Sequence, residues 1–175
     1  MTSSAAGRDY QARLLEALDR ECEIFAALIS VMEEKRRALV EVDLEPLEEI
    51  CSREEELVGR LEEADRERHQ AYLEAAPRLA PELMEPSLPE LVETLAEKRP
   101  ELAEELSRRH ARLQELLVRV GELNFDNLVL TQNLLRYTRH LLDLVASGGV
   151  LPNYSPEGKV NPAQGEPRSL LERRA

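Results

Sequence analysis

The sequence has no tryptophan, and aromatic residues make up only 3% of its 175 positions. A hydrophobic core in this chain must therefore be built from leucine, valine and alanine, which disfavours a compact sheet protein. Glycine occurs at only seven positions, whereas 33% of the residues are charged. A composition dominated by Ala, Glu, Leu and Arg is typical of long helices and coiled coils.

Long apolar runs are also missing. No stretch approaches the roughly 18 apolar residues of a membrane span, and the N-terminal sequence MTSSAAGRDY lacks the apolar centre of a secretion signal. We therefore expect a cytoplasmic protein with no direct membrane insertion. The two cysteines, Cys22 and Cys51, lie far apart without CxxC spacing, which fits two small buried side chains in a reducing compartment.

The charge balance argues against nucleic acid as a partner. The net charge is −12, which disfavours binding to phosphate backbones or anionic lipid. The charge is unevenly distributed, because residues 41–68 hold 12 acidic and 4 basic side chains while residues 106–146 hold 4 acidic and 6 basic ones. Helices from these two regions could attract each other.

Motifs of enzymes and cofactor sites are absent from the sequence. It contains no glycine-rich phosphate loop, no GxSxG elbow and no HExxH zinc motif. A di-iron bundle would require a glutamate three residues before a histidine, and none of the three histidines has one. We expect no enzymatic activity, no cofactor and no metal site.

Apolar residues recur at spacings of three and four along most of the chain, which is the period of an amphipathic helix. This pattern predicts long helices at about residues 10–42, 44–76 and 100–146. Asp43 offers an N-cap side chain between the first two, which predicts a tight antiparallel hairpin. The apolar residues expected in its seam are Leu14, Leu18, Phe25, Met32, Leu47, Ile50, Leu57 and Leu61.

Prolines interrupt the helical pattern after the second predicted helix. Four of them lie between Pro77 and Pro89, which predicts a connector. Within it, Ser87 and Glu90 have the spacing of a capping box and predict a short helix at about residues 88–98.

The predicted fold is all-α: a long antiparallel helical hairpin and a third long helix form a three-helix coiled-coil bundle with a short connector helix. We assign residues 1–149 to this helical domain. Residues 150–175 hold many prolines and few large apolar residues, so we expect a flexible C-terminal tail.

The third long helix has more apolar surface than one neighbour can cover. One stripe consists of Leu116, Leu123, Leu130, Leu134, Tyr137, Leu141 and Leu144, and a second of Leu117, Leu128, Leu135 and Leu142. Asn124, Asn127, Thr131 and Thr138 run between them. Gln132 and Asn133 point away from both stripes, so we expect them at the solvated surface.

Two interpretations of this helix stay open. In the first, it lies in the groove of the hairpin, and Asn127 sets the register of the seam. In the second, part of the apolar arc is open to a partner's amphipathic helix, and the Asn and Thr side chains fix its alignment.

The order of these features resembles the FlgN family of flagellar type III export chaperones. The similarity rests on RLLEALDRECEIFAALISVMEEKRRALVEVDLEPLEEI in the first helix and turn, REEELVGRLEEADRER in the second helix and NFDNLVLTQNLL in the last. It spans most of the chain from Leu14 to Tyr154.

The resemblance implies a cytoplasmic chaperone that binds the terminal helices of hook–filament junction proteins and delivers them to the cytoplasmic domain of the export-gate membrane protein. The client-binding residues would then be Asn124, Asn127, Leu130, Thr131, Leu134, Tyr137, Leu141 and Leu144. A tyrosine soon followed by glycine after the last helix is a familiar element of the family, and NYSPEG matches it here. Tyr154 is therefore a candidate for docking to the export gate.

A constitutive coiled-coil scaffold or adaptor is the alternative function. In that case the same apolar stripes would be buried in a homo-oligomer of this chain.

Overall fold

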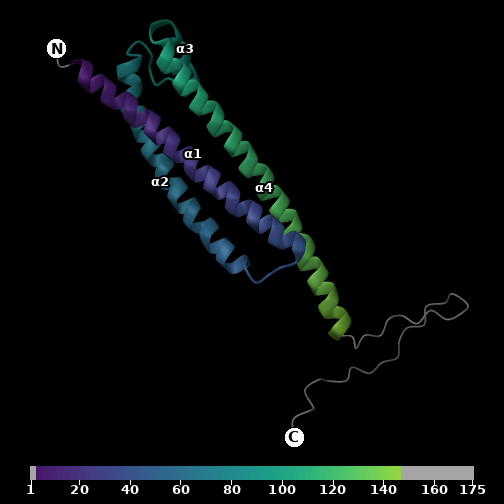
Figure 1. Ribbon diagram of the computed structural model, residues 1–175. Helices are drawn as coiled ribbons and strands as arrows, with labels where there is room; N and C mark the ends of the chain where they lie inside the picture. Colours follow the sequence, from purple (N-terminus) through teal and green to yellow (C-terminus); the bar gives the residue numbers. More distant parts are fainter. Residues whose placement is uncertain (1–2, 147–175) are drawn as a thin grey trace, which may run out of the picture. The chain divides into compact units, whose positions relative to one another are not determined.

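The computed structural model describes residues 3–146, and these form four helices and no strand. The helices are α1 (Ser3–Glu41), α2 (Leu47–Leu79), α3 (Leu88–Lys98) and α4 (Pro100–Ala146). This confirms the predicted all-α fold (Figure 1). None of these helices is both long and apolar enough to cross a membrane.

α1 and α2 form the predicted antiparallel hairpin. Ion pairs link Arg13 to Glu74 at 2.7 Å, Arg20 to Glu67 at 2.8 Å and Lys35 to Glu54 at 2.6 Å. Residue numbers rise along α1 as they fall along α2 in these pairs, so one antiparallel register holds over the whole hairpin. Cys22 and Cys51 are free thiols; Cys22 is buried, as expected, whereas Cys51 is only half-buried.

The bounds of α2 differ from the sequence prediction at both ends. It begins at Leu47 rather than near residue 44, because Pro46 occupies the N-cap position. Asp43 does not cap the helix and instead accepts a 3.4 Å hydrogen bond from the Glu45 N–H. α2 also continues through Pro77 to Leu79, since a proline this close to the end of a helix removes only one of its last hydrogen bonds.

The connector between α2 and α4 is anchored at several points. The Tyr72 hydroxyl donates a hydrogen bond to the Pro86 carbonyl oxygen, and Lys98 pairs with Glu82. The predicted capping box is present: the Glu90 carboxylate accepts hydrogen bonds of 2.7 Å from both the backbone N–H and the hydroxyl of Ser87. α3 buries Leu91 and Leu95 completely against the hairpin.

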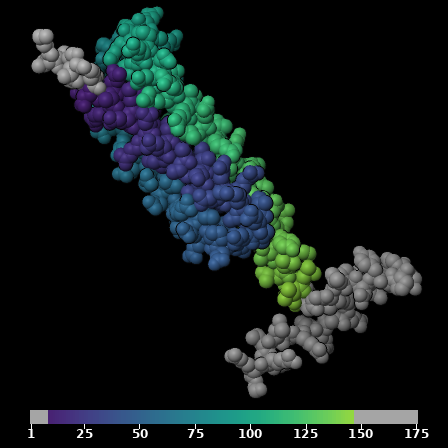
Figure 2. All heavy atoms as spheres, viewed as in Figure 1, coloured from purple at the N-terminus to yellow at the C-terminus, as the bar shows by residue number. Residues whose placement is uncertain are grey.

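The first part of α4 completes a three-helix bundle. Arg109 pairs with Asp19 and Arg119 with Glu33, each at 2.9 Å. Residue numbers rise together in these pairs, so α4 runs parallel to α1. On the face shown in Figure 2, α1 lies between α2 and this part of α4.

Two apolar clusters form the core of the bundle. The first joins all four helices near α3 and consists mainly of Leu14, Leu18, Phe25, Ala71, Ala75, Leu91, Leu95, Leu102 and Leu106. The second lies towards the α1–α2 turn and consists mainly of Ile24, Leu28, Val31, Met32, Ile50, Leu57, Ala64 and Leu123. All eight predicted seam residues belong to these clusters or pack against them. Leu47 and Leu61 are only half-buried, whereas the other six are buried.

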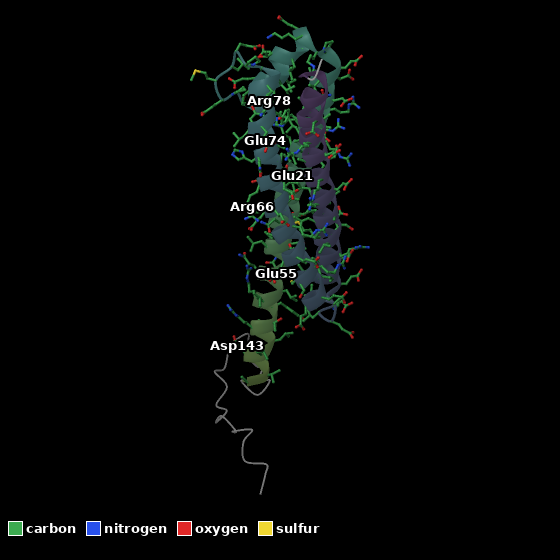
Figure 3. All side chains as sticks on the ribbon, turned by 90° about the vertical axis from the view of Figure 1, so that its left-hand side faces the viewer. Glu21, Glu55, Arg66, Glu74, Arg78 and Asp143 are labelled. Atoms are coloured by element: carbon green, nitrogen blue, oxygen red, sulfur yellow. The ribbon has the colours of Figure 1, made fainter. Side chains whose placement is uncertain are left out.

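One ion pair lies inside the hairpin rather than at its edge. The Glu21 carboxylate, labelled in Figure 3, is 2.6 Å from the Arg68 guanidinium, and the two side chains are 6% and 27% exposed. Burial raises the pKa of Glu21 above its ordinary value, and the nearby Arg68 only partly offsets this effect. The desolvation of this carboxylate therefore outweighs its attraction to its partner.

Candidate client-binding surface on α4

The first half of α4 uses its apolar face inside the bundle. Its buried residues are Leu102, Ala103, Leu106, Leu113, Leu123 and Asn127. Most of these lie at the helical spacing that faces the groove between α1 and α2. For this part of the chain, the structure supports the first interpretation of the α4 sequence.

Asn127 is the last buried residue of α4. Its side chain is 4% exposed, and Nδ2 donates a 3.0 Å hydrogen bond to the Met32 backbone carbonyl oxygen on α1. A neighbouring ion pair between Arg36 and Asp126, at 3.4 Å, links the same two helices. Asn127 thus lies in the seam between α1 and α4, where the first interpretation placed it, and its role in setting the register stays a prediction.

The character of α4 changes after Leu128. The chain divides there into two units, and the part of α4 from Val129 to Ala146 belongs to the second. No residue from 129 to 146 is buried. These residues nevertheless include large apolar side chains with high exposed fractions: Leu135 52%, Tyr137 59%, Leu141 42%, Leu142 63% and Val145 69%.

The predicted client-binding residues fall into three groups. Asn127 is buried, Asn124 is exposed on the first unit, and the others lie on the second unit. Of the latter, Leu130, Thr131, Leu134 and Leu144 are half-buried, whereas Tyr137 and Leu141 are exposed. α4 therefore places Leu130, Leu134, Tyr137 and Leu141 on one side of the helix at spacings of three and four.

The second stripe of α4, which we call the outer stripe, is exposed to solvent in each unit. Leu117 and Leu128 are 49% and 53% exposed in the first unit, and Leu135 and Leu142 are comparably exposed in the second. Gln132 and Asn133 are also exposed, as expected. Tyr154 lies outside the described residues.

The sequence analysis missed Val118 and Phe125, which are 63% and 66% exposed. Seven residues separate them, so they lie together on one side of α4, next to the side that carries Leu117 and Leu128. The signal was available for Phe125, because it follows Leu117 by eight residues and precedes Leu128 by three, both of which are helical spacings.

The second unit adds basic groups to this apolar surface. Gln132, Leu135, Arg136, Arg139, His140 and Asp143 line one shallow hollow on α4. Asp143, labelled in Figure 3, is the single acidic residue between Val129 and Ala146. An apolar stripe flanked by arginines suits an amphipathic helix that has acidic residues at its edges.

Comparison with known proteins shows a match to one protein family. Residues 10–162 match the family described as FlgN protein. No curated protein and no solved structure matches the chain.

Proposed function

Because the chain belongs to the FlgN family and is thus a flagellar export chaperone, we propose that it binds the terminal helices of hook–filament junction proteins and delivers them to the export gate. It would act in the cytoplasm, where these clients are synthesised, and hold their helices apart until export.

One observation carries the proposal. In the second unit α4 exposes six large apolar side chains and buries none, although the same helix is firmly packed up to Asn127. Exposed apolar surface of this kind on a charged protein marks an interaction site. A helix with its own apolar face is the natural occupant, since it can place one side chain per turn against the stripe.

We call the part of the first stripe that lies on the second unit, with Leu130, Leu134, Tyr137 and Leu141, the inner stripe, and it supplies most of the binding free energy in this proposal. Leu130, Leu134, Tyr137 and Leu141 would each contribute about 1.5–3 kcal/mol if a client helix covered them fully. Part of that sum offsets the loss of motional freedom on association. Asn124 and Thr131 would add alignment rather than affinity, because a misplaced partner leaves polar groups without hydrogen bonds.

Asn127 has a different place in the proposal. Its side chain is already bonded to the Met32 carbonyl. It would therefore act at the boundary, by ending the internal seam and fixing where the client surface begins. Tyr154 is proposed as a gate-docking residue on the family resemblance alone.

The test is the stoichiometry of the free and the loaded protein. Light scattering after size-exclusion chromatography should give a monomer that forms a one-to-one complex with a junction protein. A tight homo-oligomer that excludes the junction protein would contradict the proposal and favour the scaffold alternative.

A further inference from the structure

Four residues of α4 form an exposed face in the first unit, away from the core of the bundle. Val118, Phe125 and Leu128 are 63%, 66% and 53% exposed, and Gly121 is exposed between them. Their spacings of three, four and three residues are those of a coiled-coil seam, and they place the four residues within about 80° of arc on the helix. We call Val118, Gly121, Phe125 and Leu128 the glycine face. None of them belongs to either core cluster.

Gly121 leaves a gap in this face. A Cβ atom at this position would have no neighbouring atom within 4 Å, so packing among the described residues gives no reason for a glycine, which destabilises the middle of a helix relative to alanine. Gly59 on α2 is equally open, but the residues three and four positions from it are all glutamates. The corresponding neighbours of Gly121 include Val118 and Phe125. Of these two glycines, only Gly121 forms a hole with apolar walls.

The glycine face is complementary to itself when two copies of it run antiparallel. Gly121 and Phe125 lie equally far from Leu123 in the sequence, and so do Val118 and Leu128. A two-fold axis at the level of Leu123 therefore sets each Phe125 opposite Gly121 of the partner subunit. The same axis sets each Val118 opposite Leu128 of the partner subunit. The largest side chain of the face thus meets the hole, as a knob does in a coiled coil.

The charges beside the glycine face are paired within the chain. Arg119, Glu122 and Asp126 are the charged residues within its span, and each has an ion-pair partner in the first unit. The face therefore offers no unpaired charge that would attract a charged partner. An uncharged apolar surface suits it best, and a second glycine face is such a surface.

We propose that two copies of this chain pair antiparallel through their glycine faces, with each Phe125 ring seated over Gly121 of the partner subunit. The dissociation constant should be on the order of 100 µM, because each side contributes four residues, against roughly 20–30 in a standard interface. The free protein is then a monomer at the micromolar concentrations of size-exclusion chromatography and a dimer in concentrated solution. The glycine face shares no residue with the inner stripe, so the pairing does not depend on the proposed client binding.

Sedimentation equilibrium of the full chain at about 10 µM to 1 mM measures the pairing. Phe125→Gly and Gly121→Phe should each weaken it by about tenfold or more, because the first removes the knob and the second fills the hole. The double variant that combines Gly121→Phe with Phe125→Gly should restore it, since each aromatic ring again faces a glycine. Gly59→Phe is the matched control, because it adds the same ring at the other open glycine, and it should pair like the wild type.

Spin labels test the orientation of the pairing without changing the glycine face. Glu122 lies one residue and Glu115 eight residues from Leu123. In a protein whose two cysteines are replaced, antiparallel pairing separates the two copies of Glu122 by about 3 Å along the helix axis and those of Glu115 by about 24 Å. The distance between labels should therefore be clearly longer at Glu115 than at Glu122.

Three results overturn the inference. The first is a wild-type protein that stays monomeric up to about 1 mM. The second is a double variant that pairs no better than its two parents, or single variants that pair like the wild type, since Phe125 would then not face Gly121. The third is an equal distance between labels at Glu115 and at Glu122, which indicates parallel pairing.

Discussion

The Asn127 side chain on α4 donates a hydrogen bond to the backbone carbonyl oxygen of Met32 on α1, at 3.0 Å. This bond fixes one end of the parallel contact between the two helices. It lies directly before the part of α4 in which no side chain is buried. The residue therefore separates the internal seam from the proposed client surface.

We predict that Asn127→Leu keeps the fold but loosens its register. Leucine can fill the same buried place, so the free energy of unfolding should fall by less than about 1 kcal/mol or should rise. The alignment of α1 and α4 should become heterogeneous, because an apolar seam without the amide tolerates shifted pairings.

Distances between spin labels at Glu23 and Gln114, in a protein whose two cysteines are replaced, measure this alignment. A distribution as narrow as that of the parent protein would show that Asn127 does not set the register.

Arg68→Met should destabilise the hairpin by roughly 2–4 kcal/mol, because it leaves the Glu21 carboxylate buried without its ion-pair partner. The natural control is Arg66→Met, which removes an exposed arginine two residues away. Chemical denaturation of both variants measures the difference. Equal stability of the two variants would mean that water reaches Glu21 in the folded protein.

The raised pKa of Glu21 should make the free energy of unfolding depend on pH in one direction. Its pKa is raised in the folded protein, so the folded state binds a proton more tightly than the unfolded state. That contribution is fully present below the unfolded pKa of about 4.5 and is lost as the pH rises through the higher folded pKa.

Glu21→Gln removes the titration. The stability of the wild type relative to this variant should therefore fall as the pH increases above about 4.5. Glu34, Glu82 and Glu90 have lowered pKa values, owing first to hydrogen bonds from Arg53, Lys98 and Ser87 respectively. The stability that these three glutamates contribute is lost as the pH falls. Because they are present in both the wild type and Glu21→Gln, their contributions cancel in the difference between the two proteins. A difference curve that rises with pH would contradict the assignment.

Local signals in the sequence were sufficient for much of this fold. The Ser87 and Glu90 spacing predicted the start of α3, and six of the eight hairpin residues that the apolar period placed in the seam are buried. These features depend on contacts within one or two helical turns, or on a hairpin whose register follows from a short connection.

Other features depend on contacts that the sequence pattern does not encode. The parallel packing of α4 on α1 follows from the folded connector, and nothing in the apolar period of α4 specified which stripe faces the hairpin. Val42, directly after α1, has a φ of 58°, in the left-handed region. This conformation could not be predicted either, because the sequence has no glycine or asparagine at that position. The apolar period also could not show whether Asn127 lies in the seam, where its hydrogen bond to the Met32 carbonyl oxygen now places it.

The two phenylalanines of the chain offer a matched pair for testing the core. Phe25 is 5% exposed and Phe125 is 66% exposed. Phe25→Ala should cost roughly 3–5 kcal/mol in the free energy of unfolding, as for other buried aromatic residues. Phe125→Ala should cost less than about 0.5 kcal/mol. Denaturant titrations check both values, and similar losses at the two positions would mean that the α1–α2 register is wrong.

The most direct test of the proposed function is calorimetric titration of Leu134→Asp with the terminal helix of a junction protein. The control is Asn133→Asp, which places the same charge one residue away, at an exposed position on α4. We predict that Leu134→Asp abolishes client binding with little loss of helicity, because it places a carboxylate in the middle of the inner stripe, whereas Asn133→Asp binds like the wild type. If Leu134→Asp binds the client with wild-type affinity, the inner stripe of α4 is not the client site.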